Sequence, residues 1–480
     1  MRTLLIVVGT LGLTACAPET DGEARRLQTS AASREALTAA IDAIAAAALK
    51  SGPIAGLSIA VTQGGQPLLV KGYGYAEIDK KVPADPNTIY AIASVTKLVT
   101  ASAAMILVDA GKLRLDQDLA SLLPSFPNRE QGRSITVRHL LSHTSGLANY
   151  ESADAERWLT QGTPLNHEFV LDYLRDRPLD FEPGTRWSYS STGFYLLGLI
   201  IERVSGQSYE SFVREKIALP LGMNTTFQCD DRLIPAEMTR GYDVADGKLV
   251  PSTLYYEPNV RYDGGLCSTV GDLAKLPAAM GRGTVLSIAA FDQMTEPTQL
   301  ASGVTVDYGL GVRRGFLEGN RLWGHTGGWN TFWSTLAYYP SDDIAIVVLV
   351  NTEGGAEDAL TVEGKVARVV FDLGGRAASD QPVPPDVARA LSGEYQDEDG
   401  RVQIFAQKDR LLRKIENSER PAINLLYKGD YIFGRPDYPL DRVVFHVLEG
   451  RSLGLSEYYN GIFYQFSPAL DRPSGSMGAR

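Results

Sequence analysis

Two strand-like runs near the start of the chain flank a short glycine turn. Residues 57–61 and 67–75 are rich in aliphatic and aromatic side chains, and residues 63–66 (QGGQ) separate them. Glycine pairs favour the left-handed backbone of a tight turn, so this pattern predicts a β-hairpin. Before the hairpin, residues 31–49 carry apolar side chains at near-helical spacing, which predicts a helix.

A long apolar segment follows at residues 97–110 and stops at Gly111. Apolar side chains occupy nearly every position, and a helix that is apolar on all sides is a buried helix. Glycine is common just after the last residue of a helix. We therefore predict a buried helix here, and a second apolar helix over residues 194–204.

Strand-like runs return late, at residues 321–325, 331–339 and 344–351. A long, mostly helical section with Pro and Gly loops separates them from the early hairpin. Because no β-α-β alternation repeats, we expect both ends of this region to contribute strands to one sheet. The pattern predicts an α+β sandwich over residues 34–375.

Composition changes over residues 372–386, where Gly, Ser and Pro predict a linker, placed at 376–386. Beyond it, short strand-like runs are separated by turns such as Asp399-Gly400 and Asn460-Gly461. This pattern predicts an all-β sandwich or small barrel over residues 387–470. The runs lie at residues 402–406, 423–428, 431–434, 443–448 and 462–466.

The first residues have the character of an export signal. Arg2 precedes an apolar run, Leu4 to Leu13, that is too short to span a bilayer and is typical of a secretory signal. Leu13-Thr14-Ala15-Cys16 resembles a bacterial lipobox, in which the signal is cut before a cysteine that is then lipidated. An ordinary signal with an incidental cysteine is the alternative.

We therefore expect a signal peptide over residues 1–15, lipidation of Cys16, and a polar flexible tether over residues 16–33. The expected location is the bacterial cell envelope, facing the periplasm, with membrane contact through the lipid anchor only. Ala17 follows the cysteine, and the lack of Asp there favours the outer membrane in a Gram-negative host.

Charge and cysteine content exclude several classes of protein. The net charge of −11 provides no positive field for nucleic acid, so no nucleic-acid partner is expected. Three cysteines are too few for a disulfide framework. Cys229 and Cys267 can pair in an oxidising compartment, but cysteines in apolar surroundings are more often simply buried. No metal-ligand spacing or phosphate loop is found, so we expect neither metal nor cofactor.

The candidate chemistry begins with Ser94 and Lys97, three residues apart at the start of the buried helix. Residues i and i+3 share one face of a helix, so the amine can reach the serine oxygen. Burial disfavours the charged form of a lysine and lowers its pKa, which would allow Lys97 to act as a base. Free N–H groups at the helix start could stabilise an oxyanion.

Two further segments could complete a site. Tyr189-Ser190-Ser191 precedes the second apolar helix and is either a helix-start turn with a packed aromatic or a phenol that relays a proton. His325-Thr326-Gly327-Gly328 ends a predicted strand. Its glycines let a substrate approach the backbone, and the Gly328 N–H could be a second oxyanion donor. A plain strand end followed by a turn is the alternative.

In their order along the chain, these three segments resemble the serine β-lactamase and penicillin-binding-protein superfamily, in its class C-like branch. That branch also contains esterases, D-aminopeptidases and D,D-peptidases. The resemblance covers about residues 34–372 and extends to ITVRHLLSHTSGL, PGTRWSYSSTGFYLLGLIIE, LPLGM, GGLCSTVGDL and the run ending at Asn351. It implies an antiparallel sheet flanked by helices, an all-helical region, and a C-terminal lipocalin-like barrel.

The resemblance also implies roles for individual residues. Ser94 would be the nucleophile, Lys97 and Tyr189 the base system, and the N–H groups of Ser94 and Gly328 the oxyanion hole. Substrate would be bound by the residues at the remaining motif positions, which are Ser191, His325, Thr326 and Gly327.

Two motif positions depart from the family pattern. Ser191 replaces the asparagine of Tyr-x-Asn, and His325 replaces the lysine of Lys-Thr-Gly. An imidazole is mostly neutral at pH 7, so His325 would attract a substrate carboxylate less than a lysine would. Both departures favour an ester or peptide substrate over penicillin.

We expect a serine hydrolase that forms an acyl-enzyme on small-molecule or peptide substrates, of the esterase or D-amino-acid-peptidase type. A class C-like β-lactamase or D,D-carboxypeptidase is the alternative within the enzymes. A non-catalytic ligand-binding module on the same scaffold is the alternative from another class. The oligomeric state is left open, and the C-terminal β domain is hypothesised to cover part of the active-site mouth.

Several other residues could mimic a catalytic group. Residues 450–454 fit G-x-S-x-G, but that motif needs a helix after the serine, and the residues that follow have a β pattern. His139 and His143 could suggest a Ser-His pair, but in the family their loop shapes the site without acting as the base. Trp187 could line a substrate groove or simply pack.

Overall fold

The computed structural model describes residues 31–150, 166–229, 238–252, 262–329, 331–355, 357–373, 381–397, 400–419, 421–435 and 438–470. The expected signal peptide, most of the expected tether and residues 376–380 of the expected linker lie outside the described residues.

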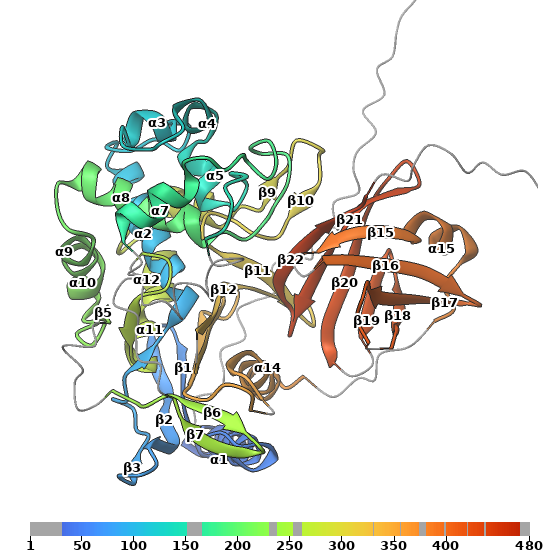
Figure 1. Cartoon of the computed structure of the whole chain (residues 1–480). Coiled ribbons are helices and arrows are strands. Elements are labelled where there is room, and N and C mark those ends of the chain that lie inside the picture. Colours follow the sequence, from blue (N-terminus) through green and yellow to red (C-terminus); the bar gives the residue numbers. More distant parts are fainter. Residues whose placement is uncertain are drawn as a thin grey trace, which may run out of the picture.

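A single antiparallel sheet organises the larger part of the chain (Figure 1). Strand β14 (Ile344–Val350) pairs with β1 (Gly56–Gln63) from Leu57↔Val350 to Gln63↔Ile344, so the prediction that early and late strands share one sheet is confirmed. The predicted hairpin is also confirmed, and Gly64 and Gly65 in its turn have φ values of 62° and 73°. In spatial order the strands are β11 (Arg313–Leu317), β12 (Asn320–Trp329), β13 (Phe332–Tyr339), β14 (Ile344–Val350), β1 (Gly56–Gln63), β2 (Gln66–Glu77) and β3 (Val82–Pro83).

Helices cover both faces of this sheet. On one face, α1 (Ala31–Ser51) and α14 (Ala359–Val370) pack against each other and share an apolar cluster with the strands. On the other face lie α2 (Thr96–Asp109), α11 (Val270–Leu273) and α12 (Lys275–Gly281). Because both faces are covered, every residue of β14 is buried, which explains its unbroken apolar sequence.

The remaining helices gather mostly around α2, which is buried without interruption from Thr96 to Met105, as predicted for an all-round apolar helix (Figure 1). They are α3 (Leu119–Leu122), α4 (Arg129–Ser134), α5 (Val137–Leu141), α7 (His167–Leu174), α8 (Ser191–Ser205), α9 (Tyr209–Val213), the π-helical turn η2 (Arg214–Ala218), α10 (Leu219–Leu221) and α13 (Ile288–Thr295). Short strands β4 (Tyr90–Ala91), β8 (Leu266–Ser268) and β5 (Phe227–Gln228) form a separate sheet, and β6 (Tyr242–Ala245) with β7 (Lys248–Pro251) and β9 (Thr298–Gln299) with β10 (Thr305–Val306) form hairpins.

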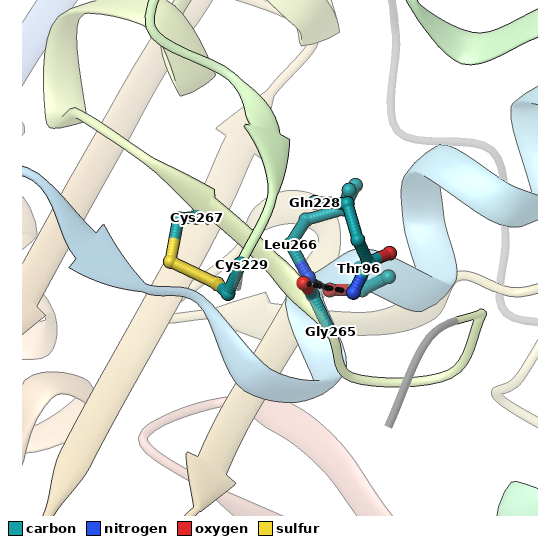
Figure 2. Close-up of a disulfide and its surroundings, with 6 residues drawn as sticks. All are labelled: Thr96, Gln228, Cys229, Gly265, Leu266 and Cys267. Carbon is teal, nitrogen blue, oxygen red and sulfur yellow. Dashed lines mark hydrogen bonds between the residues drawn. A yellow bond between two sulfur atoms is a disulfide. The ribbon is translucent and has the colours of Figure 1, made fainter. Parts of the chain in front are cut away.

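Cys229 and Cys267 form a disulfide (Figure 2), so the expectation that they are simply buried is wrong. Strand β5 pairs with β8, and this pairing brings the two Cα atoms to 5.3 Å, a distance that a disulfide spans. The cysteines are 38 residues apart, and closing a loop of that length contributes ~4 kcal/mol in the chain-entropy model. Next to the disulfide, the Leu266 N–H donates to Thr96 Oγ1 (3.1 Å), which ties this strand to α2.

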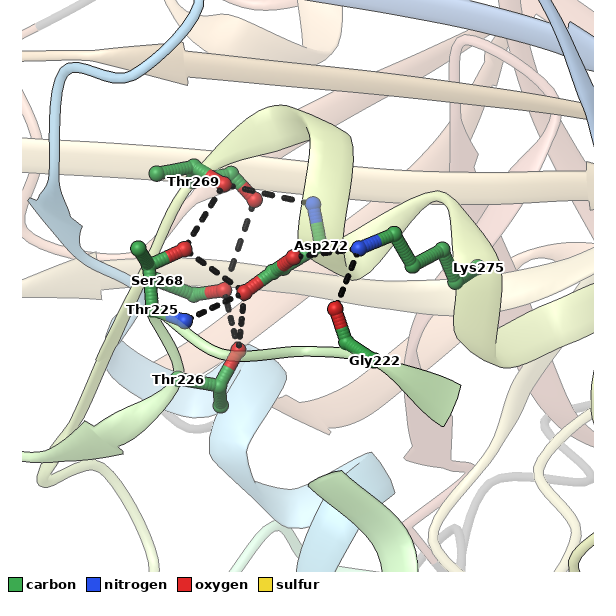
Figure 3. A network of polar contacts seen from close by, with 7 residues as sticks. All are labelled: Gly222, Thr225, Thr226, Ser268, Thr269, Asp272 and Lys275. Carbon is green, nitrogen blue, oxygen red and sulfur yellow. Dashed lines mark hydrogen bonds and ion pairs between the residues drawn. The ribbon is translucent and has the colours of Figure 1, made fainter. Parts of the chain in front are cut away.

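A polar network around Asp272 holds the turn between β8 and α11 (Figure 3). Asp272 Oδ2 accepts hydrogen bonds from the Thr225 N–H (2.7 Å) and hydroxyl (2.6 Å), and Oδ1 pairs with Lys275 (2.7 Å). Thr269 caps α11 by accepting the Asp272 N–H at 3.2 Å. The disulfide and this network therefore hold β8 and α11, which directly follow residues 262–265 at the border of the site described below.

The C-terminal module, residues 381–470, is an eight-strand meander preceded by α15 (Pro385–Leu391), which begins inside the expected linker. The predicted all-β character is confirmed, but these strands do not close into a barrel: just beyond the last strand, Ala469 forms an isolated bridge with Tyr395 and the Leu470 N–H donates to the Glu394 carbonyl oxygen (2.8 Å). The last strand, β22 (Ile462–Pro468), pairs with β11 through Gly315↔Ile462. One antiparallel sheet of 15 strands therefore runs through both modules. The strands are β15 (Gly393–Asp397), β16 (Gly400–Gln407), β17 (Arg410–Ile415), β18 (Ile423–Gly429), β19 (Ile432–Arg435), β20 (Tyr438–Leu448), β21 (Arg451–Tyr459) and β22 (Ile462–Pro468).

Candidate active site

Ser94 lies in η1 (Ala93–Val95), the short turn that leads into α2. The preceding Ala93 has φ 43°, a left-handed value that is uncommon for a residue with a side chain. Ser94 is half-buried and borders a cavity of about 480 Å³. The strained turn thus presents the serine at the cavity wall, while the helix behind it stays buried. Strain of this kind is often concentrated at functional sites.

Lys97 lies in the first turn of α2 and is fully buried. Its Nζ donates to Ser94 Oγ at 3.1 Å, so the i, i+3 spacing does bring the amine to the serine oxygen. Nζ also donates to Ser191 Oγ (3.2 Å) and to the carbonyl oxygen of Asp263 (2.8 Å). The amine is therefore sealed from solvent on the side away from the cavity.

Tyr189 lies directly before the N-terminus of α8, where Ser190 Oγ caps the helix by accepting the Gly193 N–H. Its half-buried ring borders the cavity and lies 4.9 Å (centroid) from Lys97 Nζ. The ring of His143 packs on it with centroids 4.4 Å apart. Tyr189 is thus both a packed aromatic residue at a helix start and part of the cavity wall. The structural interpretation of this segment is therefore compatible with a role for its phenol in proton transfer.

Strand β12 passes directly beside η1. A Cβ atom on Gly327 would lie 2.8 Å from Ser94 N and 2.5 Å from the Ile92 carbonyl oxygen, so only glycine allows this approach. Thr326, Gly327 and Gly328 border the same cavity as Ser94. The two residues expected to supply the oxyanion-hole N–H groups, Ser94 and Gly328, therefore share one cavity.

His325 points away from that cavity into a buried hydrogen-bonded chain. The Ser190 N–H donates to His143 Nδ1 (3.1 Å), so His143 carries its proton on Nε2. His325 Nδ1 donates to the Thr326 carbonyl oxygen at 2.6 Å, which leaves its Nε2 as an acceptor. Tyr308 joins the two rings: its oxygen accepts from His143 Nε2 (2.9 Å) and its hydroxyl donates to His325 Nε2 (3.2 Å).

Electrostatics keep both imidazoles neutral. Burial lowers the pKa of His143 well below its ordinary value, and the charges of Lys97 and Arg313 lower it further. Burial also lowers the pKa of His325 well below its ordinary value, with Arg313 and then Lys97 adding to the effect. Because both groups stay neutral near pH 7, His325 gives the site no positive charge.

Arg313, which was not predicted as a site residue, does provide a positive charge. This residue of β11 is 6% exposed and borders the cavity, with its guanidinium 5.3 Å from the Tyr189 ring centroid. Its Nη1 donates to the carbonyl oxygens of Phe463 and Tyr464. Among the described residues Nε has no hydrogen-bond partner and no carboxylate forms an ion pair with Arg313. Nothing in the local sequence distinguishes this arginine from one on the surface.

Asp263 was missed as well. It is 1% exposed, borders the cavity and accepts a hydrogen bond from the Tyr150 hydroxyl on Oδ2 (2.7 Å). Within the described part of the chain Oδ1 has no partner. Burial raises the pKa of Asp263, and the Lys97 charge opposes this shift. A buried acid thus lies beside the buried amine, shortly before Cys267 of the disulfide.

Three residues that could have mimicked catalytic or substrate-binding groups, His139, Trp187 and Ser452, lie in positions that indicate a structural role. His139 Nδ1 accepts the Thr136 N–H (3.3 Å) and completes the N-terminal cap of α5. Trp187 is buried in an apolar cluster and does not border the cavity. Ser452 lies on β21, where no helix follows it. Among the described residues no group of three or more His, Cys, Asp or Glu side chains is placed to hold a metal ion.

A serine and a buried lysine one helical turn apart, bordered by a tyrosine and a glycine-rich strand, define a serine hydrolase site of the penicillin-recognising type. The profile of the β-lactamase family matches residues 41–371. The chain belongs to the β-lactamase family, whose serine hydrolases act on ester or amide bonds.

Particular relatives agree with this assignment. The chain is 30% identical over 385 residues to penicillin-binding protein 4* of Bacillus subtilis (strain 168), covering 76% of this chain and 84% of the relative. Its fold is similar to the octameric penicillin-binding protein homologue from Pyrococcus abyssi (TM-score 0.62, 26% identity, 90% of this chain and 99% of the other). It is also similar in fold to the D-amino acid amidase from Ochrobactrum anthropi SV3 (TM-score 0.59, 24% identity, 70% and 99%).

Proposed function

We propose that Ser94 is the nucleophile that forms an acyl-enzyme with an ester or amide substrate, and that Lys97 and Tyr189 form the base system. The observation that carries this proposal is the contact between Lys97 Nζ and Ser94 Oγ at 3.1 Å, with the amine sealed from solvent and the serine at the cavity wall. An uncharged amine in such a place can accept the serine proton.

The proposed reaction has two stages. The Ser94 hydroxyl loses its proton to the Lys97–Tyr189 pair as Oγ bonds to the carbonyl carbon, and N–H groups of Ser94 and Gly328 stabilise the oxyanion. The proton then passes to the leaving alcohol or amine as its bond to the carbonyl carbon breaks. Water attacks the acyl-enzyme in the second stage, releasing the acid and restoring the Ser94 hydroxyl.

The second candidate function, a class C-like β-lactamase or D,D-carboxypeptidase, is favoured by Arg313. One of the two sequence arguments against it was His325 at the family's lysine position, which leaves that position without a permanent cation. Arg313 restores one in the same cavity, nearly buried and with an N–H that has no partner among the described residues. An unpaired buried guanidinium is costly unless an anion joins it, so the substrate would carry a carboxylate.

A substrate panel with Arg313 variants tests both candidates. Simple esters, D-aminoacyl anilides, a D-Ala-D-Ala peptide and a chromogenic cephalosporin are measured, together with a matched pair that differs only in a free or methylated carboxylate. We expect turnover of esters or amides. Arg313→Met should lower kcat/KM roughly 10- to 150-fold on the free carboxylate alone, matching ~1.5–3 kcal/mol for a hydrogen bond to a charged group. Arg313→Lys keeps the charge and serves as the control.

An equal loss on both members of the matched pair would contradict the carboxylate role of Arg313. A complete lack of turnover across the panel would instead favour the non-catalytic, ligand-binding alternative.

We also propose that the protein is exported to the cell envelope and anchored through a lipid on Cys16. The support is the apolar run ending at Leu13 and the lipobox-like residues that follow it, all outside the described residues. In the part of the chain that the structure describes, no helix has the length and apolar character to cross a bilayer. In a bacterial host, Cys16→Ser is expected to abolish incorporation of a labelled fatty acid, and labelling that persists in this variant would refute the anchor.

A further inference from the structure

The active-site cavity has a wall that comes from the C-terminal module. Tyr459 at the end of β21 and Tyr464 on β22 border the same cavity as Ser94. Their rings stack with centroids 4.5 Å apart and an interplanar angle of 29°, and Tyr464 is 38% exposed. Trp329 and Trp333 border the cavity as well, so aromatic side chains from both modules contribute to its lining.

The hairpin that carries these tyrosines contacts strand β11 of the larger module through its backbone. A Cβ atom on Gly315 of β11 would lie 1.9 Å from the Gly461 carbonyl oxygen, so the two backbones touch. The Phe316 N–H donates to that same carbonyl oxygen at 2.8 Å. Because two glycines make this contact and the ladder continues across it, the hairpin cannot move away without breaking the sheet.

Side chains around this contact connect the hairpin to residues of the larger module. Phe463 packs against Trp187 with centroids 5.1 Å apart, in a cluster that also contains Tyr308 of the buried histidine chain. The Tyr458 hydroxyl donates to Asp307 Oδ2 at 2.7 Å. Both strands of the hairpin are thus anchored next to their cavity tyrosines, β21 through Tyr458 and β22 through Phe463.

Tyr464 is also coupled to the cation of the site. Arg313 donates to its carbonyl oxygen, and the Tyr464 ring centroid lies 5.2 Å from the guanidinium carbon. Behind it, the Tyr459 hydroxyl donates to Glu457 Oε2 (3.2 Å), which pairs with Arg413 through its other oxygen at 2.9 Å. The Tyr459 ring is therefore held in place by its hydroxyl, and the partly exposed Tyr464 ring that stacks on it borders the cavity.

We infer that the β21–β22 hairpin, residues 451–468, is a specificity-determining part of the substrate site, and that Tyr464 stacks on an aromatic or large apolar group of the substrate. This inference rests on the proposed function, because the group must belong to a substrate whose carbonyl reaches Ser94. It also makes the earlier hypothesis, that the C-terminal module covers the active-site mouth, more specific. On this inference the module forms one wall of the substrate site. Aromatic groups gain from stacking on a tyrosine beyond their buried area.

The test compares selectivity in Tyr464 variants. Two matched pairs are used: acetyl and phenylacetyl esters of one alcohol, and methyl and benzyl esters of one acid. Tyr464→Ala is expected to lower the ratio of kcat/KM for the aromatic over the small member by roughly 10-fold in at least one pair. Tyr464→Phe keeps the ring and should keep the ratio. Leu448→Ala, at a residue that is 53% exposed on the same module and outside the cavity, is the matched control.

A Tyr464→Ala variant with both ratios unchanged, or with an equal loss on every substrate, would overturn the inference. Labelling of Ser94 by a fluorophosphonate separates this failure from that of the proposed function. If wild-type protein is labelled and turns over esters but selectivity does not depend on Tyr464, only the hairpin inference fails. If the wild type is neither labelled nor active, the proposed function fails first.

Discussion

Replacing Ser94 with alanine is expected to lower kcat/KM by about 10⁴-fold or more, because loss of a nucleophile removes the covalent route altogether. The fold should survive the change. Ser94 is half-buried at the cavity wall, and its side chain accepts a hydrogen bond from Lys97 at 3.1 Å. The measurement is hydrolysis of the best substrate in the panel, with fluorophosphonate labelling followed by mass spectrometry and a thermal melt to verify folding.

Ser102→Ala provides the matched control for this experiment. Ser102 lies on the same helix and is fully buried, and its hydroxyl donates to the Leu98 carbonyl oxygen (2.8 Å), away from the cavity. This variant should keep both labelling and turnover. Labelling that is undiminished in Ser94→Ala would remove Ser94 from the proposed role and, with it, the proposed mechanism.

Replacing Lys97 with methionine is expected to lower the rate of acylation roughly 10²- to 10⁴-fold, the usual contribution of a positioned general base. Methionine fills a similar volume without the amine, so the buried helix should still pack. Two buried acceptors, Ser191 Oγ and the Asp263 carbonyl oxygen, lose their donor, and each such loss costs about 1–3 kcal/mol of stability. The measurement is single-turnover acylation, with unfolding in urea as the stability readout.

Lys97→Arg separates a base from a fixed positive charge. A guanidinium keeps the charge but does not give up its proton at any ordinary pH, so it cannot accept the proton of Ser94. If Lys97 acts as the base, the arginine variant should be as inactive as the methionine variant. Acylation at near-wild-type rate in Lys97→Arg would show that the site needs only a cation at this position.

Local pattern was sufficient for the parts of the site that lie on one element. The contact between Ser94 and Lys97 follows from helical geometry alone, and the burial of that helix follows from its apolar sequence. The early hairpin was recoverable for the same reason, because Gly64 and Gly65 specify the turn and the turn specifies the pairing.

Features that depend on distant pairing could not be predicted. Arg313 resembles any strand arginine until β22 is placed against β11, and only then is its guanidinium enclosed beside Tyr189. The disulfide likewise depends on the pairing of β5 with β8. The all-β character of the C-terminal part was predicted, but the pairing of β22 with β11 was not, because nothing in the alternating pattern of a strand specifies which neighbour it pairs with.

Because one sheet continues through both modules, the two cannot be separated without exposing a strand edge. Strand β11 is bonded on one side by β12 and on the other by β22. A chain cut before residue 381 would leave β11 as an edge strand, with unpaired backbone groups next to the apolar surface that Trp187 and Tyr308 now bury against Phe463. Exposed edges of this kind recruit other chains, so the shortened protein would self-associate instead of behaving as an isolated catalytic domain.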